Sequence, residues 1–163
     1  MSRSPGFEIL DHTADIRLAS TGKTLEETMF ELIKGVIRLL AKTETDLGER
    51  QSDYFEDISE DIRAKTEREI RVTAPNLERA VVTLLNEIIY LYDAEGFEPS
   101  DVSRLAVDRG SVDGGSQIRI TVGITGIGQG HADAKERRPS RIKAATYHGI
   151  VASDTRIEVV FDT

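Results

Sequence analysis

The pattern of apolar and polar residues predicts two amphipathic helices. In the first, from about Thr24 to Lys42, apolar side chains recur every three or four residues along one stripe. Thr24 and Glu27 have the spacing of a capping box, in which the Glu27 side chain reaches back to the amide of the cap residue. The second helix runs from about Asn76, a good N-cap, to Asp93. The stripes expected in the core are Leu25, Met29, Leu32, Ile33, Val36 and Leu40, and Leu77, Val81, Leu84, Leu85, Ile88 and Tyr92.

Alternation with a period of two predicts antiparallel, half-buried strands. The segments are Phe7–Leu10, one around Ile16 and Leu18, one around Ile70 and Val72, Val102–Val107, Ile118–Ile124, Ile142–Ala152 and Arg156–Phe161. The order of strand, helix, strand, helix and then several strands predicts an α+β fold. We expect a mainly antiparallel β-sheet layer with the two helices packed on one face.

The length of 163 residues suits one domain, so we expect residues 1–163 to form a single unit. Between the first helix and the next strand, residues 43–65 carry eight acidic residues against three basic ones. This acidic excursion is predicted to lie on the surface, as a short helix or as an exposed loop.

Charge and composition exclude several classes of function. The chain has 21 Lys and Arg against 29 Asp and Glu, a net charge of −8, which disfavours direct, tight nucleic-acid binding. It has no cysteine, so any metal must be bound through oxygen or imidazole. We find no signal-peptide pattern and no apolar run of about 20 residues, and therefore expect a cytoplasmic, soluble protein without membrane contact.

Three polar clusters are candidates for chemistry. Asp11–Asp15 combines carboxylates with His12 ahead of a strand, although a simple turn is favoured about two to one. The end of the chain offers the Asp162 carboxylate and the α-carboxylate of Thr163, which would form a hard-metal corner if the last strand is held in a sheet. Arg141–Gly149 contains Lys143, Tyr147 and His148, either as a polar site or as an ordinary strand with Lys143, Ala145, Tyr147 and Gly149 on one face.

Two other features are assigned no chemistry. Gly126–Gly130 is glycine-rich, but no helical pattern follows it, as a phosphate-binding loop would require. Asn86 and Glu87 on the second predicted helix look solvent-facing.

Taken together, the motifs resemble those of the archease family over Phe7 to Thr163. The resemblance is carried by LDHTADI at Leu10–Ile16, TLEET at Thr24–Thr28, LLNEIIYLYDAEGF at Leu84–Phe97, IKAATYHG at Ile142–Gly149 and the final VVFDT. The pair formed by HTAD and KAATYH is specific, whereas either motif alone would be weak. The chain departs from the family in its longer acidic excursion.

The resemblance implies a non-catalytic accessory protein of the tRNA-splicing RNA ligase, which promotes guanylylation and multiple turnover of that enzyme. It also implies an α+β fold and a divalent cation bound by Asp15, Asp162 and Thr163. Asp46, or Glu44 in its place, is a further functional acid, and His12 and Lys143 are supporting or partner-contacting groups. An all-oxygen site favours calcium, with magnesium or manganese as alternatives.

Two other functions stay open from the sequence. A small metal-dependent hydrolase would use Asp15, Asp162 and His148 to activate water. A general chaperone-like binding module would need an exposed apolar patch, for which the sequence offers no spare apolar stripe.

Overall fold

The computed structural model describes residues 4–11, 15–41, 65–128 and 140–163. Seven strands and two helices lie in these ranges. In chain order they are β1 (Gly6–Asp11), β2 (Ile16–Thr21), α1 (Leu25–Ala41), β3 (Lys65–Ala74), α2 (Leu77–Asp93), β4 (Phe97–Val112), β5 (Gly115–Gly128), β6 (Ala144–Ala152) and β7 (Arg156–Asp162). His12, Asp46 and almost all of the predicted acidic excursion fall outside the described residues.

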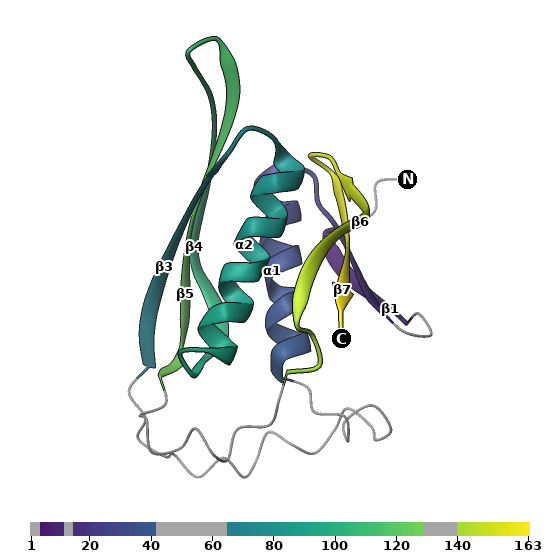
Figure 1. Cartoon of the computed structure of the whole chain (residues 1–163), viewed down its shortest axis with the longest axis vertical. Coiled ribbons are helices and arrows are strands. Elements are labelled where there is room, and N and C mark those ends of the chain that lie inside the picture. Colours follow the sequence, from purple (N-terminus) through teal and green to yellow (C-terminus); the bar gives the residue numbers. More distant parts are fainter. Residues whose placement is uncertain (1–3, 12–14, 42–64, 129–139) are drawn as a thin grey trace.

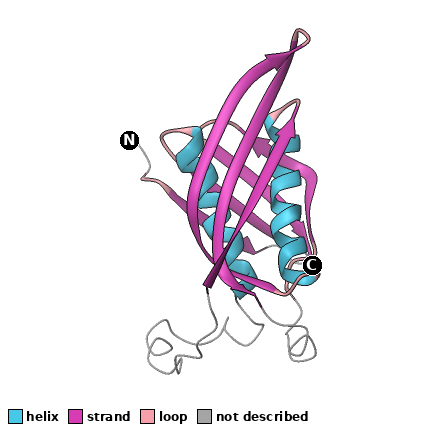
Figure 2. Ribbon diagram, turned by 90° about the vertical axis from the view of Figure 1, so that its left-hand side faces the viewer, coloured by secondary structure: helices cyan, strands magenta, loops and turns pink. Residues whose placement is uncertain are grey.

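The strands form two antiparallel sheets with the helices between them. One sheet has the order β1-β2-β7-β6 and the other the order β3-β5-β4. Helix α1 contacts β2 and β4, and helix α2 contacts β3 and β6, so each helix touches both sheets. Figure 1 shows the three layers side by side, and Figure 2 shows β3, β4 and β5 lying across the helices.

The α+β class, the two helices and the antiparallel strands are therefore confirmed, while the single sheet layer becomes two layers. The reason lies in the width of the buried surface of α1. Beyond the predicted stripe, the helix also buries Thr28, Ile37 and Leu39, so its apolar surface is too wide for one sheet to cover. The core accordingly joins buried side chains from both helices and both sheets.

Both helices begin where the capping residues predict. The Arg79 amide donates to Asn76 Oδ1 at 2.9 Å, and the Glu27 amide donates to Thr24 Oγ1 at 3.2 Å. The Glu27 carboxylate accepts from the Lys23 amide at 2.7 Å, one residue before the amide that we expected. These bonds satisfy amides that a helix leaves free in its first turn.

The glycine-rich segment serves strand packing, because Gly126 and Gly128 lie within β5. A Cβ atom added to Gly126 would come within 2.2 Å of the Glu98 carbonyl oxygen on neighbouring β4. Only a residue without a side chain fits this approach. Within the described ranges, neither helix is long and apolar enough to cross a membrane.

Candidate functional site

A corner of the four-stranded sheet brings together three segments far apart in the sequence. Ile16 at the start of β2 pairs with Phe161 of β7, and Asp162 at the end of β7 pairs with Ala144 of β6. Asp15 immediately precedes Ile16, so it lies next to Asp162 at the same end of the sheet. Both carboxylates are exposed. The sheet register therefore places two of the predicted ligands side by side.

The last residues of the chain are held in place by the segment that leads into β6. The Lys143 amide donates to the Asp162 carbonyl oxygen at 2.7 Å. Its ammonium group donates to a backbone oxygen of Thr163 at 3.2 Å. The end of β7 is thus anchored twice, which preorganises the oxygens of Asp162 and Thr163.

An irregularity in β6 carries His148 to this corner. Thr146 pairs with Val160 and Val151 with Glu158, so residues 147–150 lie opposite the single residue Val159. Gly149 within this bulge has φ of +59°, a backbone conformation that favours glycine. The bulge ends the alternation predicted for this strand.

The predicted common face of the segment was therefore wrong: Ala145 is buried, whereas Lys143 and Tyr147 are exposed. The strand itself begins at Ala144 and not at Ile142.

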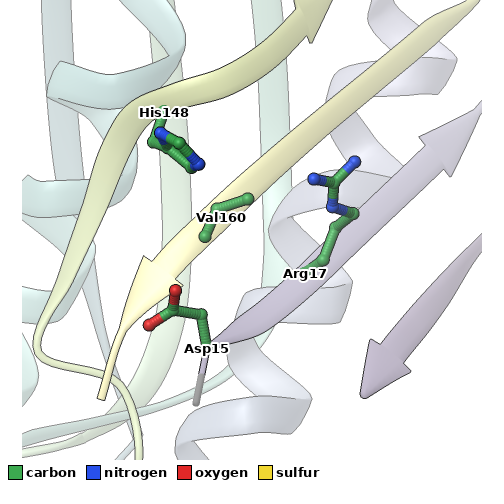
Figure 3. A pocket seen from close by; sticks show the side chains of 4 residues that line it. All are labelled: Asp15, Arg17, His148 and Val160. Carbon is green, nitrogen blue, oxygen red and sulfur yellow. The ribbon is translucent and has the colours of Figure 1, made fainter. Parts of the chain in front are cut away.

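A small pocket of about 70 Å³ lies beside the carboxylate corner. It is lined by Asp15 and Arg17 of the β2 segment, His148 of the bulge and Val160 of β7. Figure 3 shows that these side chains come from three elements, with Val160 between the histidine and the two β2-side residues. The pocket joins Asp15 to His148, but Asp162 does not line it.

Two arginines share one carboxylate on the same face of the sheet. Glu158 of β7 accepts from Arg156 Nε at 2.7 Å and from Arg17 Nη1 at 3.2 Å. The hydrogen bond and the charge of Arg156, followed by the hydrogen bond and the charge of Arg17, keep the pKa of Glu158 below its ordinary value. The Arg17 Nε atom is buried and has no hydrogen-bond partner among the described residues.

The donor set at the corner is suited to a hard divalent cation. Asp15, Asp162 and the Thr163 carboxyl end would supply oxygen donors, the type that calcium, magnesium and manganese prefer. Within the described ranges, no three His, Asp or Glu side chains form a metal-binding group, so a cation at this corner would also require oxygen atoms of Thr163. Sequence reasoning did not find Arg17 and Glu158, whose only signal was their polar position in strand alternation.

Comparisons with known proteins agree with this fold. The model of the Archease protein family (MTH1598/TM1083) matches residues 7–163. The protein archease of Methanosarcina mazei is 27% identical over 169 residues, covering 99% of this chain and 98% of the relative. That of Ictalurus punctatus is 26% identical, covering 95% of this chain and 82% of the relative.

A solved structure shares the architecture. The solution structure of Methanobacterium thermoautotrophicum protein 1598 superposes with a TM-score of 0.56 at 25% identity, covering 97% of this chain and 99% of that one. The described residues thus define an α+β protein with two antiparallel sheets around two helices and a carboxylate corner at one sheet end. The chain belongs to the archease family, as its motifs predicted.

Proposed function

We propose that this protein is a non-catalytic accessory factor that activates a tRNA-splicing RNA ligase, promoting guanylylation and multiple turnover. Membership of the archease family supports an accessory role. The observation that carries the proposal is the sheet register, which puts Asp15 next to Asp162 at an anchored chain end. A cation bound there would present a positive charge to an oxygen ligand of the partner.

The residues of the chain have separate tasks in this proposal. Asp15, Asp162 and the Thr163 carboxyl end hold the divalent cation, with calcium the first choice and magnesium or manganese next. Lys143 positions the chain end through its two bonds to residues 162 and 163. Asp46 and His12, which lie outside the described residues, remain predicted contributors.

The partner is an enzyme that binds RNA and therefore presents positive charge. A net charge of −8 favours rapid encounter with such a surface and disfavours tight RNA binding by this protein itself. We propose that the protein binds the ligase in the cytoplasm.

The test combines metal binding with ligase turnover. Calorimetry with Ca²⁺ and with Mg²⁺ is expected to show at least about tenfold weaker binding in Asp15→Asn, because a charged ligand is lost. Multiple-turnover ligation with guanosine triphosphate should fall in parallel. Asp113→Asn is the matched control, since Asp113 lies at the exposed turn between β4 and β5 in the other sheet.

Unchanged stimulation by both Asp15→Asn and a chain without residues 162–163 would refute the proposal. The hydrolase alternative has no support from the comparisons, and Asp162 does not line the pocket that holds Asp15 and His148. Hydrolysis by the isolated protein would be the observation needed to revive it.

A further inference from the structure

The pocket beside the carboxylate corner combines one carboxylate with two side chains that can donate hydrogen bonds. Asp15 supplies the carboxylate, and Arg17 and His148 supply the donors. In Figure 3 the imidazole of His148 and the guanidinium of Arg17 lie on either side of Val160, with the carboxylate of Asp15 below them. Arg, His and a cation-binding carboxylate are groups that together recognise phosphate oxygens.

Arg17 retains hydrogen-bonding capacity that the described residues do not use. Its Nη1 donates to one oxygen of Glu158, whose other oxygen is bonded to Arg156. One carboxylate thus serves two guanidinium groups. The Nε atom of Arg17 is buried with no partner among the described residues, an arrangement that costs free energy.

Gly149 in the β6 bulge lies next to Arg17. A Cβ atom on Gly149 would lie 3.5 Å from Arg17 Nη2, an ordinary contact distance, and the positive φ of Gly149 favours glycine at this position. The pocket volume of about 70 Å³ holds several water molecules or one tetrahedral oxyanion. Its size and its donors therefore match a single phosphate group.

The charges around the pocket make phosphate binding depend on a cation. Arg17 and Arg156 against Glu158 leave one positive charge, and Lys143 offsets the Thr163 carboxylate. Asp15 and Asp162 add two negative charges. A phosphate would meet net negative charge in the metal-free corner. A divalent cation would make the net charge positive, and it would attract the phosphate.

We propose that Arg17 and His148 bind the terminal phosphate of a small phosphate compound, such as a nucleotide, and do so together with the divalent cation at Asp15. This inference rests on the proposed metal corner and adds a ligand to it. The acidic net charge of the chain favours a small compound over an RNA strand.

The experiment is a calorimetric titration of the full chain with inorganic phosphate, in saturating Mg²⁺ and in chelator. We expect binding in Mg²⁺ and at least about tenfold weaker binding in chelator. Arg17→Gln should weaken phosphate binding about tenfold or more, because a charge-assisted hydrogen bond is lost. Exposed His148 allows His148→Ala as a second variant with little risk to folding.

Arg156→Gln is the matched control, because Arg156 bonds the same Glu158 but does not line the pocket. Equal losses in Arg17→Gln and Arg156→Gln, or phosphate binding that is independent of Mg²⁺, would overturn the inference. Mg²⁺ binding is measured separately in each protein. If Mg²⁺ binds and phosphate does not, the inference fails and the metal corner stands. If neither Mg²⁺ nor Ca²⁺ binds, both fail.

A second comparison tests the class of ligand. Uridine 5′-monophosphate and a short RNA with a terminal phosphate are titrated under the same conditions. Similar affinities for the nucleotide and inorganic phosphate support the proposal. RNA binding more than about tenfold tighter than nucleotide binding would overturn the assignment to a small compound.

Discussion

Asn86 of helix α2 joins the helix layer to the strand that carries the site, and its removal is predicted to be costly. Its Oδ1 atom accepts from the Ala145 amide at 2.7 Å, and its Nδ2 group donates to the Ala145 carbonyl at 3.2 Å. Strand β6 is an edge of its sheet, and no further strand among the described residues bonds this backbone. The asparagine side chain takes the place of that strand.

The magnitude follows from the two bonds and from burial. Ala145 is only 5% exposed, so water cannot readily replace Asn86. Truncation in Asn86→Ala leaves one buried donor and one buried acceptor without partners, and we expect a loss of about 2–4 kcal/mol in the free energy of unfolding.

Urea unfolding measures this loss, and hydrogen exchange should show a faster-exchanging Ala145 amide. Glu87→Ala is the control, because exposed Glu87 neighbours Asn86 on the same helix. Its stability should change by less than about 0.5 kcal/mol. A similarly small change in Asn86→Ala, or an Ala145 amide that stays protected, would refute the reasoning.

Two further predictions concern stability. Helix propensity alone predicts that Gly35→Ala stabilises the protein by about 1 kcal/mol. The added Cβ would, however, lie 2.7 Å from buried Leu18 on β2, so we expect thermal unfolding to show no change or a loss of up to about 2 kcal/mol. A net gain close to the propensity value would show that α1 and β2 are not tightly packed. Glu158→Gln should lose about 1–2 kcal/mol at pH 7. The pKa of Glu158 in the folded protein lies below the ordinary 4.5, so its carboxylate stabilises the fold above that pH and loses this effect as the pH falls through the folded-state value. The stabilities of the wild type and Glu158→Gln should therefore converge in acid. A stability difference that stays constant down to pH 2 would contradict this prediction.

The secondary structure was predictable because it depends on local signals. The predicted stripes and caps located α1 and α2, and period-two alternation located the segments that became strands. The cap of α2 at Asn76 is one example, since it depends on residues three positions apart. Spacing between residues this close in the chain can be recognised from the sequence without knowledge of the fold.

The candidate site was only partly predictable. HTAD and the final VVFDT marked Asp15 and Asp162 as candidates, but neither motif shows that the two residues are neighbours in a sheet. Asn86 looked solvent-facing because its partner, the backbone of Ala145, is 59 residues away in the chain. From the sequence, Glu158 could not be distinguished from other outward-facing strand residues. Its partner Arg17 is 141 residues away in the chain and lies beside it only in the folded structure.

The sequence by itself determined the helices, most strands and the acidic charge, because these follow from residue type and short-range spacing. Tertiary structure decided that the helices lie between two sheets, since only the packed chain shows how wide a buried surface each helix needs to cover. It also decided the pocket of Asp15, Arg17, His148 and Val160. That pocket depends on strand order and on a bulge with a positive φ at Gly149, and both arise from long-range pairing that no local pattern encodes.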